Sequence, residues 1–168
     1  MAFRDLILNN LRRKLFALLL AVLIWTTIYF ADKEHLSRYG SLLSGDNYVA
    51  MRHGPVPSAI YNLLKAAAGR QEPLIPAQFY ELVSQSLKVE DRRRVLPLRE
   101  AKLDLLSSSQ RECLDESIKV NGRLSFVRLT AKSHDAAWKT ADENDLIEVK
   151  AIAKTLPNAK QVLAYLED

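Results

Sequence analysis

Seventeen consecutive residues without a charge, from Leu15 to Ala31, constrain this chain more than any other feature of its sequence. A basic cluster at residues 12–14 precedes the run, and Asp32 follows it. As a helix the run would be about 25 Å long, at about 1.5 Å per residue, whereas the hydrocarbon core of a bilayer is about 30 Å thick. The segment is therefore either a short membrane span or a helix that a folded domain covers on all sides.

The two interpretations place the rest of the chain differently. If the segment inserts, Arg12, Arg13 and Lys14 keep the amino terminus in the cytoplasm and put residues 32–168 beyond the inner membrane, as a single-pass protein. If it does not insert, residues 15–31 are covered by the domain, by a second copy of the chain in a homo-oligomer, or by a partner protein. The sequence alone leaves both alternatives open.

The composition indicates one folded domain in a reducing compartment. Of 168 residues, 48% are hydrophobic, which is enough for a core of ordinary size. The single cysteine, Cys113, has no partner for an internal disulfide, and we expect it to be a small buried residue. Most of the net charge of +4 lies in the first 31 residues, so the remainder is nearly neutral and nucleic acid is not the expected partner.

Local patterns predict an α+β fold that is mainly α-helical. Ser107 and Gln110 match a capping box, in which each side chain hydrogen-bonds to the backbone N–H of the other. Pro157 separates the last two predicted helices, because proline cannot continue a helix but fits near the start of one. Helices are expected over residues 58–69, 107–122, 126–133, 145–156 and 158–166.

Strand patterns are short. Residues 48–51 form a β-prone run, and Val83, Leu87 and Val89 share the parity of one strand face, so we expect residues 83–89 to pair with residues 95–96 as a small hairpin across an arginine turn. Residues 69–76 are expected to form a loop. Residues 53–57 are expected to lack regular structure because their two prolines have no N–H to donate.

The sequence offers no recognisable catalytic constellation. It contains no GxxxxGK, GxGxxG, HExxH or GxSxG motif, and its five glycines leave little for a phosphate-binding loop. The histidines, His35, His53 and His134, are far apart in the sequence. We therefore expect a protein that is not an enzyme and that needs no metal, cofactor or small-molecule substrate.

Two segments carry a family resemblance. Residues 29–65 contain the run AMRHGPVPS, and residues 122–138 read GRLSFVRLTAKSHDAAW. Both resemble the Panacea domain, which is found in bacterial and phage antitoxins. The family's signature positions correspond here to Tyr29, Ala31, Asp32, Leu36, Gly40, Ala50, His53, Gly54, Pro55, Val56, Pro57, Tyr61, Leu64, His134 and Trp138.

The resemblance implies a mainly helical α+β fold that binds and neutralises a protein toxin encoded beside it; with the hairpin predicted above, we expect a compact helical domain with a small β-hairpin. It does not name the toxin, because family members are paired with many unrelated toxins. Residues 1–28 instead resemble the N-terminal membrane anchor of YbbR-domain proteins. The expected organisation is thus an apolar helix over residues 1–28, either anchor or core, followed by a Panacea-like antitoxin domain over residues 29–168.

The antitoxin interpretation predicts a partner-binding surface. Proline-rigid loops lose little entropy on binding, and tyrosine is common at binding hot spots. The expected toxin-binding residues are His53, Gly54, Pro55, Val56, Pro57, Tyr61, His134 and Trp138. An alternative is that residues 53–57 form a structural corner in which Gly54 supplies a special backbone angle.

Neutralising a cytosolic toxin favours a cytoplasmic protein over an anchored one. In the alternative the chain is a membrane-anchored regulatory or adaptor module at the inner membrane, held through residues 15–31.

Overall fold

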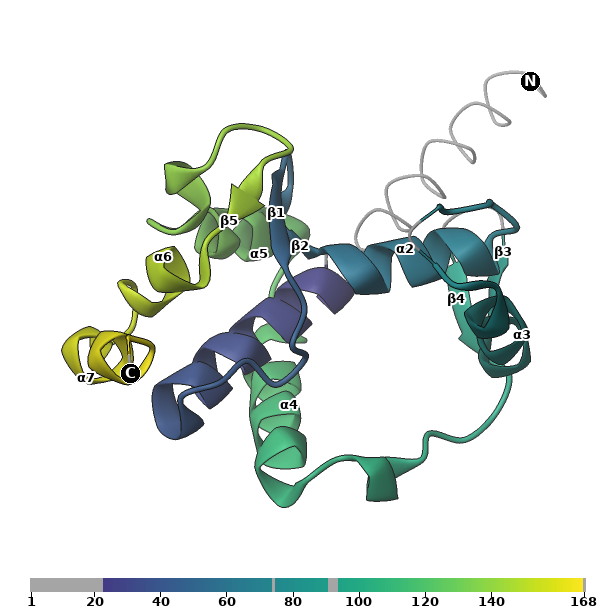
Figure 1. The fold of residues 1–168 in the computed structure, drawn as a ribbon, viewed down its shortest axis with the longest axis horizontal. Coiled ribbons are helices and arrows are strands. Elements are labelled where there is room, and N and C mark those ends of the chain that lie inside the picture. The colour runs from purple at the N-terminus through teal and green to yellow at the C-terminus, as the bar shows by residue number, and fades with distance from the viewer. Residues whose placement is uncertain (1–22, 74, 91–93, 168) are drawn as a thin grey trace, which may run out of the picture.

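The computed structural model describes residues 23–73, 75–90 and 94–167, beginning with a helix over residues 23–39 (Figure 1). The uncharged residues 23–31 form the first part of this helix, where Tyr29 and Ala31 are completely buried. Residues 1–22, and with them most of the expected anchor, lie outside the described residues. None of the helices in the described part of the chain is long and apolar enough to cross a membrane.

A three-stranded antiparallel sheet packs beside this helix. Its central strand is β1 (Tyr48–Met51), as expected, and its edges are β2 (Gly54–Pro57) and β5 (Leu146–Ile147). The prediction that residues 53–57 lack regular structure is therefore wrong for residues 54–57.

The register explains how an edge strand accommodates two prolines. The N–H of Ala50 donates to the carbonyl of Asp145, on the β5 side, at 2.9 Å. The residues of β1 adjacent to Ala50 therefore direct their hydrogen-bonding groups towards β2, because these groups alternate sides along a strand. Ala50 is opposite Pro55. Pro55 and, by the same alternation, Pro57 thus occupy positions where the nitrogen faces away from β1 and no N–H is needed.

The described residues between 58 and 106 form an arm, which extends to one side of the molecule in Figure 1. The elements of the arm are α2 (Ser58–Ala67), α3 (Ala77–Ser86), β3 (Leu87–Glu90), β4 (Arg94–Pro97) and the short 3₁₀ helix η1 (Leu103–Leu105). The first of them, α2, follows Pro57, which cannot cap it. Asp46 supplies the cap from elsewhere in the chain, because its carboxylate accepts the N–H groups of Ala59 and Ile60 at 2.9 and 3.1 Å.

Within the arm, α3 replaces the first part of the strand expected over residues 83–89. Val83 is buried on α3, and β3 begins only at Leu87. These two residues are four apart, a spacing that fits one face of a helix as well as one face of a strand. The hairpin is confirmed, because β3 and β4 pair antiparallel with Val89 opposite Val95. Part of the expected arginine turn, residues 91–93, lies outside the described residues.

The second half of the chain is mostly helical. Its remaining elements are α4 (Ser108–Asn121), α5 (Phe126–Ser133), the 3₁₀ helix η2 (Trp138–Thr140), α6 (Val149–Ala153) and α7 (Ala159–Tyr165). The capping box of α4 is confirmed, with Gln110 N–H donating to the Ser107 hydroxyl and Ser107 N–H donating to the Gln110 side chain. The single helix expected over residues 145–156 is wrong, because β5 pairs with β1 before α6 begins.

The main hydrophobic core lies where the helix over residues 23–39 meets the sheet, α6 and α7. Tyr29 packs edge-on against Tyr48 of β1, with ring centroids 5.1 Å apart. The buried residues of this core are Tyr29, Leu36, Tyr48, Ala50, Ala137, Ile147, Ile152, Ala153, Leu156 and Val162. The fold is thus α+β, with the helix over residues 23–39 and β1 near its centre.

Gly54 fixes the position of β2 against α5. Its φ of 123° lies in a region that L-residues with side chains rarely adopt, and a Cβ placed there would collide with the side-chain oxygen of Ser133. Ser133 is completely buried, so it has little room to move.

We expect Gly54→Ala to lower the free energy of unfolding by about 2–4 kcal/mol, from backbone strain together with the collision. Urea denaturation measures this loss. Gly45→Ala is the matched control, because Gly45 has a φ of 62° but nothing within 4 Å of the added Cβ; its cost should be about 1 kcal/mol. Equal losses in the two variants would contradict the proposed collision.

Candidate functional site

The structure brings the two family-like segments together. The indole N–H of Trp138 donates to the Met51 carbonyl at 3.0 Å, and the backbone of Gly54 approaches Ser133. The ring of His53 meets Phe126 edge-on at 5.6 Å. The turn between β1 and β2 is therefore joined to both ends of α5 and to η2, and we call this assembly the corner.

His134 and Trp138 form the most regular contact of the corner. Their rings are stacked, with centroids 3.8 Å apart and planes 5° apart. The pKa of His134 is lowered from its usual 6.5, chiefly because burial disfavours the charged ring. The charges of His53 and Lys139 act in the same direction, and a hydrogen bond to the Arg52 backbone opposes them. The neutral imidazole is therefore the form that this packing favours.

Asp135 ties the corner to the helix over residues 23–39. Its Oδ2 accepts hydrogen bonds from the Tyr29 hydroxyl at 2.9 Å and from the Lys33 ammonium at 2.7 Å. Its Oδ1 accepts the backbone N–H of Trp138, the first residue of η2, at 3.1 Å. Burial and the charge of Asp135 raise the pKa of Tyr29, so this phenol stays protonated and donates. One carboxylate thus joins the helix over residues 23–39 to η2.

Asp32, on the helix over residues 23–39, has a similar role. Its side chain is completely buried and accepts hydrogen bonds from the Ser44 N–H, the Ser44 hydroxyl and the Tyr48 hydroxyl. Burial, and then Asp32 itself, raise the pKa of Tyr48 well above 10. These donors compensate the loss of water around the carboxylate.

The expected site residues divide into three groups. Gly54, Pro55, Val56 and Pro57 are buried in β2, while His53, His134 and Trp138 are partly exposed and meet in the corner. Tyr61 lies on α2, and its ring centroid is 5.7 Å from that of Trp25. The Lys65 ammonium lies 4.6 Å from the centroid of the Tyr61 ring. The structure therefore gathers three of the eight residues as a partly exposed group, and Tyr61 belongs to the arm.

The corner also presents a hollow to solvent. A cavity of about 390 Å³ lies beside Trp138 and is lined as well by Arg52 and Glu143. Within the described residues, no group of three or more His, Cys, Asp or Glu side chains is arranged to hold a metal ion. The arrangement offers aromatic and charged groups for contact with a partner.

Sequence reasoning did not single out Asp135 or Lys33. A signal was available for Asp135, because an aspartate three residues before a helical N–H is a common capping arrangement. The contact of Lys33 with Asp135 joins residues 102 apart in the chain. No local pattern could have predicted that contact.

The family model described as antitoxin SocA-like, Panacea domain, matches residues 27–139, which include both segments of the corner and the whole arm. A search of curated proteins found no match, and neither did a search of solved structures.

The lowered pKa of His134 predicts a pH-dependent stability. Below about pH 6.5 the His134 ring binds a proton more readily in the unfolded chain than in the native protein. The stability of the fold is therefore full above this pH and falls as the pH decreases towards the native pKa. Urea denaturation at pH 7.5 and 5.5 measures the decrease. His134→Phe keeps a ring on Trp138 but cannot titrate, so it should show a smaller decrease; an unchanged decrease would contradict the assignment to His134.

Proposed function

The chain belongs to the family of SocA-like antitoxins with a Panacea domain, and from this membership we propose that it neutralises a cognate protein toxin, encoded by a neighbouring gene, by binding it directly. The match over residues 27–139 carries the proposal. The antitoxin acts by covering its toxin, without a catalytic step and without a cofactor.

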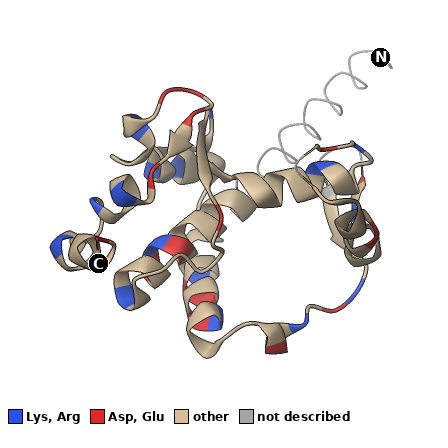
Figure 2. Ribbon diagram, in the orientation of Figure 1, with Lys and Arg blue, Asp and Glu red and all other residues tan. Residues whose placement is uncertain are grey.

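The exposed apolar side chains support a protein partner. Exposed apolar patches on a soluble domain are characteristic of protein interaction surfaces. Among the described residues, large exposed apolar side chains recur along the arm, at Phe79, Leu82, Leu98, Leu103 and Leu105. Basic and acidic residues are interspersed along the described elements (Figure 2), which suits a protein partner better than the backbone of a nucleic acid. We propose that the toxin contacts the arm, including Tyr61, together with His53 at the corner.

We further propose that the antitoxin is cytoplasmic, because it must meet a toxin made in the same compartment. Cell fractionation tests this point: the protein should remain in the soluble fraction after mild lysis. Recovery with membranes that resist a high-salt wash would favour the anchored adaptor instead.

Co-expression with the product of the adjacent gene tests the function itself. The full chain should rescue growth, and the two proteins should co-purify after tagging of either one. Rescue without a detectable complex would contradict direct binding.

We expect Tyr61→Ala and His53→Ala each to weaken toxin binding by more than about 1 kcal/mol while changing the melting temperature little. Isothermal titration calorimetry with the purified toxin measures the affinity. Tyr61→Phe is the control, because it keeps the ring that contacts Trp25 and Lys65. Unchanged affinity in two stably folded alanine variants would remove both residues from the interface.

We also expect Leu105→Ser, in the arm, to weaken toxin binding by more than about 1 kcal/mol. Leu105 is 76% exposed, so its replacement should change the free energy of unfolding by less than about 0.5 kcal/mol. Leu146→Ser is the matched control, since Leu146 is 63% exposed but lies on β5, outside the arm. Equal effects of the two substitutions on affinity would argue against the arm.

A further inference from the structure

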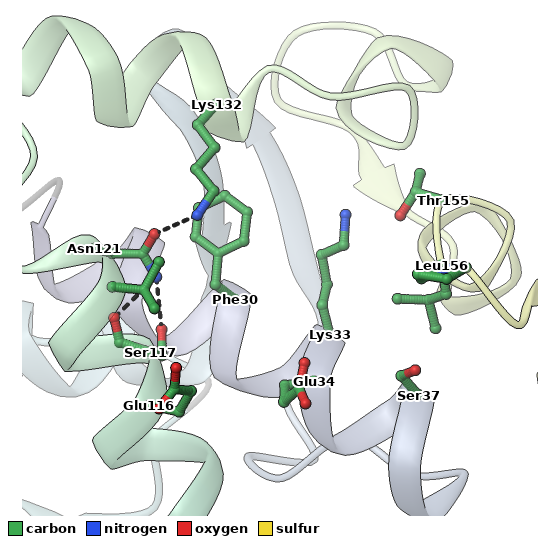
Figure 3. Close-up of a pocket in the computed structure, with 12 residues that line it drawn as sticks. Phe30, Lys33, Glu34, Ser37, Glu116, Ser117, Asn121, Lys132, Thr155 and Leu156 are labelled. Atoms are coloured by element: carbon green, nitrogen blue, oxygen red, sulfur yellow. Dashed lines mark hydrogen bonds between the residues drawn. The ribbon is translucent and has the colours of Figure 1, made fainter.

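A second cavity shares no lining residue with the hollow beside Trp138 or with the arm. It measures about 310 Å³ and is bounded by the helix over residues 23–39, by α4, by Lys132 of α5 and by residues 155–157 (Figure 3). This volume is at the small end of the range for pockets that bind small ligands. Neither the family match nor the proposed toxin contact assigns a role to this cavity.

Two ammonium groups line the cavity, and they differ in how their charges are compensated. Lys33 forms an ion pair with Asp135 at 2.7 Å. Lys132 donates to the amide oxygen of Asn121 at 2.6 Å and lies 4.3 Å from the centroid of the Phe30 ring. Among the residues that the structure describes, none provides Lys132 with a carboxylate at ion-pair distance. The charge of Lys132 is therefore the uncompensated one.

The surroundings hold Lys132 in place. The amide of Asn121 donates to the carbonyl and hydroxyl of Ser117, at 2.9 and 3.0 Å, and the Ser117 hydroxyl donates to the Thr27 carbonyl at 2.7 Å. Asn121 is 1% exposed, so its oxygen is directed at Lys132 by a buried network. The ammonium is thus positioned in advance, which lowers the entropy cost of binding an anion.

Electrostatics favour an anion beside Lys132. Burial lowers the pKa of this lysine, and the positive charge of Lys33 lowers it further. A carboxylate placed between the two ammonium groups would be attracted to both and would relieve their repulsion.

The acidic residues of the cavity limit the charge of such a ligand. Figure 3 shows Glu34 and Glu116 on the side of the cavity away from Lys132. They lie 3.8 Å from Arg38 and Lys119 respectively, at the outer limit for an ion pair. Their carboxylates disfavour a doubly charged phosphate, whereas a singly charged anion matches the one uncompensated ammonium.

The cavity also has an apolar side. Phe30, Val120 and Leu156 are among its lining residues. A ligand that reaches Lys132 with its charge would place adjoining groups against these side chains.

We propose that this cavity binds a carboxylate joined to an apolar group, with Lys132 as the principal contact of the charge and Phe30 as a contact of the apolar group. The ligand is a free carboxylic acid or the C-terminal residue of a polypeptide, which share this chemistry. The proposal does not depend on toxin neutralisation.

Titration of the full chain with 3-phenylpropionate, followed by NMR, tests the proposal without any toxin. We expect saturable shifts of the Asn121 side-chain amide, and at least tenfold weaker binding of the neutral 3-phenylpropionamide. Equal affinity for acid and amide, or no binding of the acid, would overturn it.

Substitutions locate the contact. Lys132→Met should weaken binding of the acid at least tenfold, while Lys132→Arg should keep the affinity within about threefold. Lys160→Met removes an equal charge from α7, at a residue that does not line the cavity, and should have no effect. If Lys132→Met does not fold, as judged by its melting curve, Lys132→Gln replaces it. Full affinity in a folded variant without the lysine charge would overturn the proposal.

Peptides separate the two sources of the carboxylate. A tetrapeptide ending in phenylalanine with a free C-terminus is compared with its C-terminal amide. Tenfold tighter binding of the free peptide than of 3-phenylpropionate supports a chain end, and equal or weaker binding of that peptide supports a free acid. Failure of both the peptide and the acid to bind would overturn the proposal even if toxin neutralisation is established.

Discussion

The buried carboxylate of Asp32 constrains the centre of this structure. It is the first charged residue after the uncharged run and is completely buried, so its charge is stable there only if several donors replace water. Ser44 and Tyr48 supply these donors. The loop that carries Ser44 and the strand that carries Tyr48 are thereby held against one turn of the helix over residues 23–39, and β2 and β5 are built outward from that strand.

Sequence patterns correctly predicted the elements that are determined by residues close together in the chain. The capping box at Ser107, the β1 strand and the β3–β4 hairpin depend on residues close in sequence, and all three are confirmed. Two of the failures have non-local causes. Residues 54–57 pair with β1 because the positions of the prolines match the outward side of an edge strand, and residues 146–147 extend because β1 offers them a free edge. Neither partner strand is visible from the segment itself.

The sequence was enough to predict which residues meet at the site, but not which of their side chains are exposed. The sequence singled out His53, His134 and Trp138, and the structure brings these three together. Which side chains face solvent depended on the sheet, and burial of Gly54 to Pro57 follows from their pairing with β1. Asp135 links this corner to Lys33, which lines the separate cavity beside Lys132.

The family match ends at residue 139, but the hydrophobic core does not. Ile152 and Val162 are 1% and 4% exposed, and they reach the core from α6 and α7. Burial of such side chains contributes about 1.5–3 kcal/mol each, which is comparable to a sizeable part of the stability of a small domain. β5 in addition provides hydrogen-bond partners for one edge of β1. The segment beyond the match is therefore an integral part of the folded unit that positions the corner.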